Sequence, residues 1–248
     1  MKRVIGLIPV RLESTRLPGK ALKEIEGIPA IIHVYKRALF SSLLDEVYVC
    51  TDSDEIASVC KKFSCKVVKT GKHKNGSERI YEASKLINAD IIINIQGDEI
   101  MVNPRHIDLI VEEMILNREI EYCMGVTPFQ KTNSPQDFKV VLNSKSEIIY
   151  CSRSDIPSQK IVQTQLQKLV FIVGFTKNSL KQFVSWPESI LEVSEPNEFL
   201  RIIENDKKIK TVYLKDAFIS LDTEDDLWEI RQKMQSDNLL NRYIESYR

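Results

Sequence analysis

The chain has 248 residues, of which 43% are hydrophobic and 28% are charged, a composition typical of one large globular α/β domain or of a domain with a subdomain. Its 35 basic residues balance its 35 acidic residues, which argues against a nucleic-acid partner and against a polybasic membrane anchor. We expect no signal peptide and no membrane span, because charges interrupt the first apolar run and no run approaches the roughly 20 residues required. Five cysteines without C-x-x-C spacing predict reduced thiols in a cytoplasmic protein.

The first half of the chain alternates between strand and helix patterns. Apolar or β-prone runs predict strands at residues 4–8, 46–51, 66–69 and 90–95. Helices are predicted at 29–43, at 52–63 with Asp52 as N-cap, at about 77–87 with Ser77 as cap, and from Pro104 onward. This alternation indicates right-handed crossovers. The expected fold class is therefore α/β, with a Rossmann-like, mostly parallel sheet flanked by helices.

The second half of the chain has a different pattern. Strands are predicted at 121–127, 138–143, 147–151, 170–175 and 210–214, and helices at 195–204 and after the capping box that begins at Thr223. The strands at 138–143 and 147–151 form a hairpin that is expected to project as an arm, and the Gln-rich segment 157–168 is expected to be a mobile loop or a short helix. We therefore expect one domain over 1–248, with an inserted arm or subdomain at about 121–168.

The loop after the first predicted strand is rich in cations. It reads Pro9-Val10-Arg11-Leu12-Glu13-Ser14-Thr15-Arg16-Leu17-Pro18-Gly19-Lys20. In α/β sheets, ligands bind at the carboxyl ends of the strands, and arginine and lysine side chains bind phosphate oxygens. The loop therefore predicts a polyphosphate site, with a solvated basic loop as the alternative. The chain lacks G-x-G-x-x-G, and Ser14 and Ala21 break the P-loop pattern, which argues against dinucleotide oxidoreductases and P-loop kinases.

Three further segments carry groups that could act beside a polyphosphate. Gln96-Gly97-Asp98-Glu99 follows the central strand, and its acids suit Mg²⁺, with an ordinary strand-end turn as the alternative. Asp222 is either a second metal ligand or a neighbour of a helix cap. The segment from His73 to Arg79 offers a helix N-terminus to a phosphate or a base edge, although it is equally consistent with a plain loop. We expect His73 itself on the surface.

Together these motifs resemble the bacterial 3-deoxy-manno-octulosonate cytidylyltransferases (CMP-Kdo synthetases). The resemblance covers nearly the whole chain, in segments 9–20, 51–52, 75–79, 96–99, 138–142, 150–157, 191–192, 200–201 and 221–223. It implies an Mg²⁺-dependent enzyme that joins CTP to the anomeric hydroxyl of an acidic 2-keto-3-deoxy sugar and releases pyrophosphate, for the synthesis of surface polysaccharide or lipopolysaccharide. It also implies a homodimer formed through the arm around residues 139–152.

The resemblance also assigns roles to individual residues. It places Arg11, Ser14, Arg16 and Lys20 at the triphosphate, Ser77 and Arg79 at the cytidine, Gln96 beside the substrates, and Asp98 and Asp222 at Mg²⁺. Lys20, Arg16 and Asp98 are then the expected catalytic groups. The expected sugar-binding residues are Arg153, Leu169, Val173, Glu198 and Phe199, and Arg11 or Arg153 is expected to meet the sugar carboxylate.

The expected sugar pocket departs from the family pattern. Where the family has His, Tyr and Gln, this chain has Leu169, Val173 and Phe199. A pocket that loses polar groups in this way is expected to prefer a deoxy, amino or acylated sugar acid over the unmodified sugar. Two alternatives remain, a sialic-type nonulosonate as substrate and a nucleotide-binding dimer without catalytic activity.

Overall fold

The chain folds into two compact units. The structure is a computed structural model, and it describes residues 2–158, 160–161, 164–217 and 219–245. The first unit contains residues 2–108 and 219–245, and the second unit contains the described part of 109–217. The arm that we expected at 121–168 belongs to the second unit.

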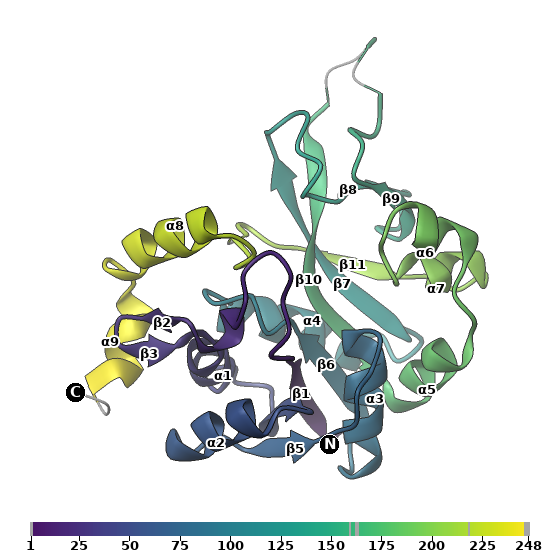
Figure 1. Ribbon diagram of the computed structural model, residues 1–248. Helices are drawn as coiled ribbons and strands as arrows, with labels where there is room; N and C mark the ends of the chain where they lie inside the picture. Colours follow the sequence, from purple (N-terminus) through teal and green to yellow (C-terminus); the bar gives the residue numbers. More distant parts are fainter. Residues whose placement is uncertain (1, 159, 162–163, 218, 246–248) are drawn as a thin grey trace. The chain divides into compact units, whose positions relative to one another are not determined.

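The first unit is built on a parallel sheet (Figure 1). Its strands are β1 (Val4–Pro9), β4 (Glu46–Thr51), β5 (Val67–Lys69) and β6 (Ile91–Ile95), in the order β6-β1-β4-β5 with every pair parallel. β1 and β6 are buried at every residue, as their predominantly apolar sequences predict. Because parallel strands end at the same edge, the loops after β1, β4, β5 and β6 meet there. That edge holds the candidate site.

Helices and short elements complete the first unit. They are η1 (Lys20–Leu22), the hairpin of β2 (Glu24–Ile25) and β3 (Ile28–Pro29), α1 (Ala30–Ala38), α2 (Asp54–Lys62), α3 (Gly76–Lys85), the first turns of α4 (Pro104–Leu116), α8 (Glu224–Met234) and α9 (Asn238–Ile244). The predicted α/β fold class is thus confirmed. In the part of the chain that is described, no helix combines the length and the hydropathy that crossing a membrane requires.

Three predicted helix boundaries are wrong, each for an identifiable reason. The N-cap of α2 is Ser53, whose side chain accepts from Ile56 N, while Asp52 forms an ion pair with Arg79. The N-cap of α3 is Asn75, which lies before the predicted cap. Helix α1 ends at Ala38 because the residues after it turn to meet the Asp108 carboxylate, which accepts from Ser41 Oγ and from the backbone N–H groups of residues 42 and 43. The predicted capping box of α8 is confirmed.

The second unit contains a mixed sheet. Its strands are β7 (Tyr122–Phe129), β8 (Lys139–Leu142), β9 (Ile148–Ser152), β10 (Leu166–Thr176) and β11 (Lys210–Tyr213). β7 pairs antiparallel with β10 and parallel with β11, and β8 pairs antiparallel with both β9 and β10. The predicted β8–β9 hairpin is therefore confirmed. Residues 159, 162 and 163 of the predicted Gln-rich segment lie outside the described residues. The last three residues of that segment, 166–168, are the first residues of β10.

Short helices follow the strands of the second unit. They are α5 (Lys177–Ser185), α6 (Ile190–Ser194) and α7 (Leu200–Glu204). The single helix predicted at 195–204 is thus wrong, because α6 ends before it and only α7 lies inside it. The core of this unit is aromatic, since the Phe199 ring stacks on Phe183 with centroids 6.1 Å apart and lies 6.2 Å from Phe171 and 6.4 Å from Phe175.

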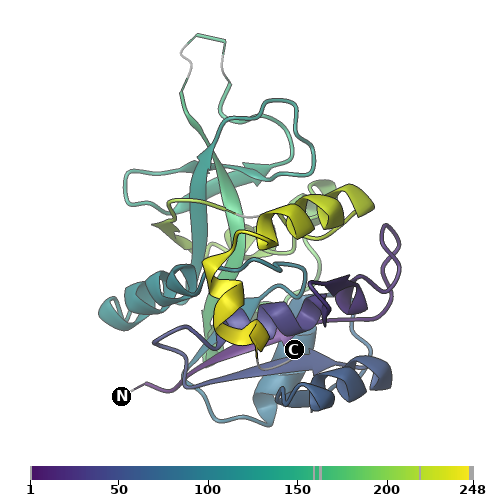
Figure 2. The same cartoon turned by 90° about the vertical axis from the view of Figure 1, so that its left-hand side faces the viewer.

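Polar contacts tie the C-terminal helix to α1 within the first unit, and both views show α9 beside α1 (Figures 1 and 2). The fully buried His33 on α1 donates from Nε2 to the carbonyl of Ile25 at 2.8 Å and accepts at Nδ1 from the Tyr243 hydroxyl at 2.7 Å. One turn later, Arg37 pairs with Asp237 at the start of α9 and donates to the carbonyl of Val102 at 2.8 Å. Helix α9 is therefore anchored by a neutral imidazole and an ion pair.

The buried imidazole predicts acid sensitivity. Burial lowers the pKa of His33 to about 4, from the ordinary value of 6.5 that applies in the unfolded chain. His33 is then neutral in both states above about pH 6.5, and the free energy of unfolding falls as the pH drops toward 4, by up to about 3 kcal/mol, because the unfolded chain takes up the proton. We expect His33→Gln to lower this loss, measured by urea unfolding at about pH 7.5 and about pH 5. A loss equal to that of the wild type would show that His33 does not carry the effect.

Candidate functional site

A cavity of about 250 Å³ opens in the first unit at the carboxyl ends of its strands. Eight residues predicted from the motifs line it. They are Arg11, Ser14, Arg16, Lys20, Arg79, Gln96, Asp98 and Asp222. The structure thus brings together the basic loop, the acidic turn after β6 and the segment before α8. The predicted residue Ser77 is fully buried and does not line this cavity.

Lys20 joins the two predicted metal ligands. Its Nζ donates to Asp98 Oδ2 at 2.6 Å and to Asp222 Oδ1 at 3.0 Å, and Arg16 approaches the same Asp222 oxygen at 2.9 Å. Burial alone would lower the pKa of Lys20, but the charges and hydrogen bonds of Asp98 and Asp222 outweigh burial and raise it. The ammonium is therefore held in its charged form between two carboxylates.

Local backbone geometry sets this arrangement. Gly19 has a φ of +66°, a left-handed conformation that suits glycine, and the chain then enters η1 with Lys20 as its first residue. Gly97 is required by a close approach, because a Cβ there would lie 2.8 Å from the carbonyl oxygen of Pro9. The turn after β6 can therefore pass directly over the end of β1, which brings Asp98 beside the basic loop.

Backbone and side-chain bonds place Asp222 beside Asp98. Leu221 N donates to the carbonyl of Asp98 at 2.9 Å, and Ser220 Oγ donates to the buried Glu99 carboxylate at 2.6 Å. The segment before α8 is thus tied at two points to the turn after β6. Asp222 directly precedes the N-cap Thr223 and also lines the cavity, so both positions that the sequence suggested apply, and its role as a metal ligand stays a prediction.

Arg79 holds the ends of two strands together. Its side chain is 4% exposed, pairs with Asp52 Oδ1 at 3.0 Å after β4, and donates to Thr70 Oγ1 at 2.7 Å after β5. Asp52 already balances much of its charge. Arg79 therefore contributes to the cavity wall chiefly by fixing these loops, and its predicted contact with cytidine stays a prediction.

His73 belongs to the cavity wall, whereas the sequence predicted a surface position. Its side chain is partly buried, and Nε2 is hydrogen-bonded to Glu82 while Nδ1 lies 3.7 Å from Glu78 Oε2. The hydrogen bond from His73 lowers the pKa of Glu82. Glu78 and Glu82 are four residues apart and share one face of α3, a spacing that could have indicated this contact in the sequence.

A second hollow of about 270 Å³ adjoins the first along the same loop. It is lined by Arg11, Leu12, Glu13, Asp52, Ser53, Lys72, His73 and Arg79, four of which also line the first cavity. The combined surface extends from the two carboxylates past the ends of β4 and β5. Such a surface can hold an elongated anionic molecule whose charged end lies at Arg11, Arg16 and Lys20.

The five predicted sugar-binding residues lie in the second unit. Leu169, Val173 and Phe199 are 4%, 0% and 3% exposed, so their side chains belong to the core of this unit. Glu198 is half-buried, and Arg153 lies on the unit's surface loop after β9. The three apolar side chains are packed within this unit, and the contact of this group with a sugar stays a prediction.

Two carboxylates that converge on one cation also suit a divalent metal. Asp98 and Asp222 each place an oxygen within 3.0 Å of the same nitrogen atom, and Mg²⁺ is commonly held by one or two carboxylates together with phosphate oxygens. Among the described residues, no group of three or more His, Cys, Asp or Glu side chains is arranged for a metal. The site therefore fits an ion that arrives with a phosphate ligand better than an ion held by protein alone.

Comparison with known proteins identifies relatives over nearly the whole chain. A family model described as cytidylyltransferase matches residues 5–209. The 3-deoxy-manno-octulosonate cytidylyltransferase of Chlorobium limicola is 36% identical over 237 residues, which are 92% of this chain and 96% of the relative. That of a Nitratiruptor species is 37% identical over 233 residues, which are 90% of this chain and 97% of the relative.

Solved structures that resemble this chain include an enzyme of the same kind as these relatives. The structure of CMP:2-keto-3-deoxy-manno-octonic acid synthetase complexed with CTP has a TM-score of 0.91 and 32% identity, and the match covers 94% of this chain and 98% of that one. A putative glucose-1-phosphate thymidylyltransferase from Bacillus anthracis has a TM-score of 0.70 at 14% identity, over 95% of this chain and 96% of that one, which shows a shared fold alone.

The site predicts different effects for two nearby lysines. We expect Lys20→Ala to weaken the binding of a nucleoside triphosphate by roughly ten- to a hundredfold, because it removes a charge-assisted contact. Lys23→Ala is the matched control, since Lys23 follows η1 and pairs with Glu224 outside the cavity lining. Titration calorimetry measures both. Equal affinities for Lys20→Ala and wild type would make the basic loop a structural element.

Proposed function

Because the chain belongs to the cytidylyltransferase family and its relatives are 3-deoxy-manno-octulosonate cytidylyltransferases, we propose that it transfers the cytidylyl group of CTP to a 2-keto-3-deoxy sugar acid. The acceptor is 3-deoxy-manno-octulosonate or a close relative of it, and the second product is pyrophosphate. The observation that carries the proposal is the placement of Lys20 between Asp98 and Asp222, in a cavity that also contains Arg11 and Arg16.

The chain's own residues supply positioning and charge. Arg11, Arg16 and Lys20 bind the triphosphate and neutralise charge on the departing pyrophosphate, which is the main contribution of a protein to phosphoryl transfer. The anomeric oxygen of the sugar attacks the α-phosphate in line with the bond that breaks. Lys20 exchanges its carboxylate partners for phosphate oxygens when the nucleotide brings its own negative charge into the cavity. No residue is assigned as general base.

We propose Mg²⁺ as the cofactor, held by Asp98 and Asp222. When bound, the ion supplies positive charge that stabilises the charge developing on the α-phosphate. The support for this assignment is the convergence of the two carboxylates on one position.

Neutral variants of the two carboxylates test the metal site. Asp98→Asn and Asp222→Asn keep the side-chain shape but remove a ligand charge, so we expect each to lower turnover by at least about a hundredfold and to weaken Mn²⁺ binding in the presence of CTP. Asp225→Asn is the control, because Asp225 is exposed in the first turn of α8. Pyrophosphate release measures turnover, and electron paramagnetic resonance measures bound Mn²⁺. Wild-type values for either site variant would remove that residue from the metal site.

The acceptor sugar is tested by a direct comparison. Apolar residues at positions 169, 173 and 199 predict poor use of unmodified 3-deoxy-manno-octulosonate relative to a deoxy, amino or acylated relative. The measurement is kcat/KM for each sugar acid at fixed CTP, with a sialic-type nonulosonate in the same panel. Efficient use of the unmodified sugar would instead mean that these residues only repack the core of the second unit. If no sugar acid supported pyrophosphate release, the proposed activity itself would be wrong.

We also propose a homodimer formed through the β8–β9 arm. Ile149 on β9 is 51% exposed and Tyr213 on the edge strand β11 is 60% exposed, so this unit presents large apolar side chains that a second copy could cover. Light scattering at micromolar concentration is expected to give a dimer, and Ile149→Lys is expected to weaken it. A monomeric wild type would contradict the assignment.

For location, we propose the cytoplasm. The five cysteines are free and buried, which favours a reducing compartment. Cell fractionation tests this directly, and recovery of the protein outside the cytoplasm would contradict it.

A further inference from the structure

A lysine in the second unit is completely buried. Lys139, the first residue of β8, has an exposed fraction of 0%. Its ammonium donates to the carbonyl oxygens of Ser134 at 2.7 Å, Asp137 at 2.9 Å and Arg153, and Asp155 Oδ1 lies 3.6 Å from it. All three donor hydrogens thus have backbone acceptors, and one carboxylate balances the charge.

This environment is unusual for a strand residue. Removing an ammonium from water is costly unless hydrogen bonds and an opposite charge replace the water, and an apolar side chain would fill the same inward position without that cost. The presence of a lysine at this position is therefore explained by the two segments whose carbonyl groups it binds. Its three acceptors belong to two segments, residues 134–137 before β8 and residue 153 after β9, which a single cation ties together.

The residue most constrained by this arrangement is Arg153. Its carbonyl accepts from Lys139, and its N–H donates to Glu195 Oε2 at 3.0 Å, so a charged side chain fixes the backbone on each side of it. Glu195 also accepts from Ser152 Oγ at 2.6 Å and from the Tyr150 hydroxyl at 3.1 Å. Burial alone would raise the pKa of Glu195, but these hydrogen bonds and Arg153 lower it and keep the carboxylate charged.

The Arg153 side chain is oriented by two contacts, neither of them with a carboxylate. Its guanidinium lies 4.2 Å from the centre of the Phe138 ring and donates to the carbonyl of Pro135 at 2.6 Å. No carboxylate of the described residues forms a direct ion pair with it, in contrast to Arg201, which pairs with Glu192 in the same unit. A fixed guanidinium with remaining donors is suited to bind a carboxylate in a bidentate manner.

We propose that Lys139 is a positioning residue for the acceptor sugar, in that its buried ammonium, together with Glu195, fixes Arg153 so that the guanidinium is preset for the sugar carboxylate. This rests on the proposed function, which supplies the carboxylate. Lys139 does not touch the sugar itself. Its contribution is to reduce the conformational entropy that the Arg153 side chain loses when the sugar acid binds.

A double-mutant cycle tests the proposal. We expect Arg153→Gln to raise KM for the sugar acid by about tenfold or more and to leave KM for CTP unchanged. Lys139→Met removes the buried charge at similar length and is expected to raise the same KM with little change in kcat. In the Arg153→Gln background, Lys139→Met should add almost nothing, because both changes act through one guanidinium.

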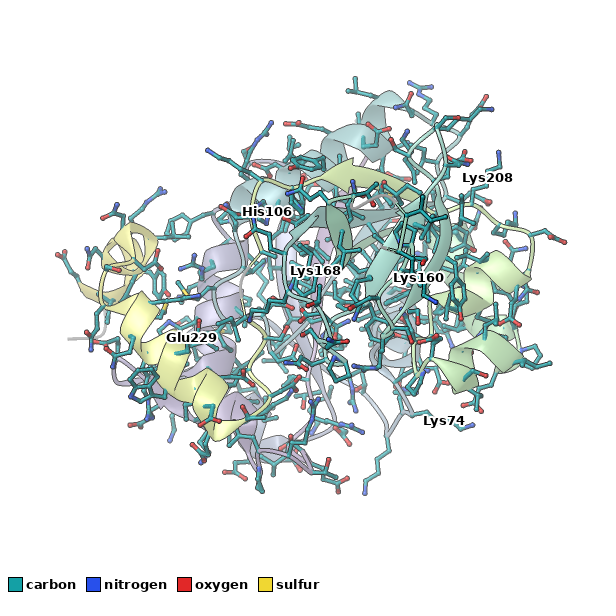
Figure 3. The ribbon with its side chains drawn as sticks, turned by 90° about the horizontal axis from the view of Figure 1, so that it is seen from above. Lys74, His106, Lys160, Lys168, Lys208 and Glu229 are labelled. Carbon is teal, nitrogen blue, oxygen red and sulfur yellow. The ribbon has the colours of Figure 1, made fainter. Side chains whose placement is uncertain are left out.

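A second readout does not depend on turnover. Amide hydrogen exchange at residues 133–137 and 152–155 is expected to accelerate in Lys139→Met and to stay at the wild-type rate in Lys208→Met. Lys208 is the matched control because it is a lysine of the same unit with a side chain 70% exposed (Figure 3). If Lys139→Met fails to fold, Glu195→Gln weakens the other anchor of Arg153 and is expected to raise KM for the sugar acid while sparing KM for CTP.

The outcomes separate this inference from the proposed function. Wild-type protein that releases no pyrophosphate with any sugar acid would contradict the proposed function, and unchanged exchange at residues 152–155 in Lys139→Met would still overturn the positioning role. With an active wild type, three results would overturn the inference. They are an unchanged KM for the sugar acid in Lys139→Met, equal increases in both KM values, and full additivity with Arg153→Gln.

Discussion

The ion pairs of Lys20 connect three parts of the chain that are remote in sequence. Asp98 is 78 residues away from Lys20, and Asp222 is 202 residues away, yet both carboxylates contact one ammonium. These ion pairs depend on the parallel sheet, which brings the loops after β1 and β6 to one edge. They also depend on Gly97, where any side chain would collide with the end of β1. Because the two carboxylates would otherwise repel each other, the lysine ammonium between them keeps them together.

Two lysines show how burial decides what a cation can do. The Lys20 side chain is 21% exposed and bonded to side-chain carboxylates, so solvent and a triphosphate can replace its partners. Lys139 is fully buried and bonded to backbone carbonyls, which cannot be exchanged without moving the chain. The first arrangement suits a group that changes partners during a reaction, and the second suits a group that holds a loop in place.

The sequence predicted the strands and eight of the residues that line the cavity, because long apolar runs mark buried strands and parallel strands bring the loops that follow them to one edge. It failed where tertiary contacts decide. Asp52 pairs with Arg79 instead of capping α2. Helix α1 ends earlier than predicted because the residues that follow it bind the Asp108 carboxylate. His73 is drawn into the cavity wall by two glutamates of α3. Lys139 carries no local signal, since its partners are backbone groups that only the folded chain brings together.

The central proposal is that the Lys20 ammonium occupies the position of the metal ion between Asp98 and Asp222, and that it moves to the phosphates of the nucleotide when CTP and the metal bind. A crystal structure of the protein with CTP and Mn²⁺, with the metal located by anomalous scattering, tests it most directly. The account predicts that Asp98 and Asp222 both ligate Mn²⁺ and that Lys20 Nζ has moved within hydrogen-bond distance of a phosphate oxygen. A structure with CTP and Mn²⁺ bound, but with Lys20 still between the two carboxylates or the metal held by other residues, would contradict it.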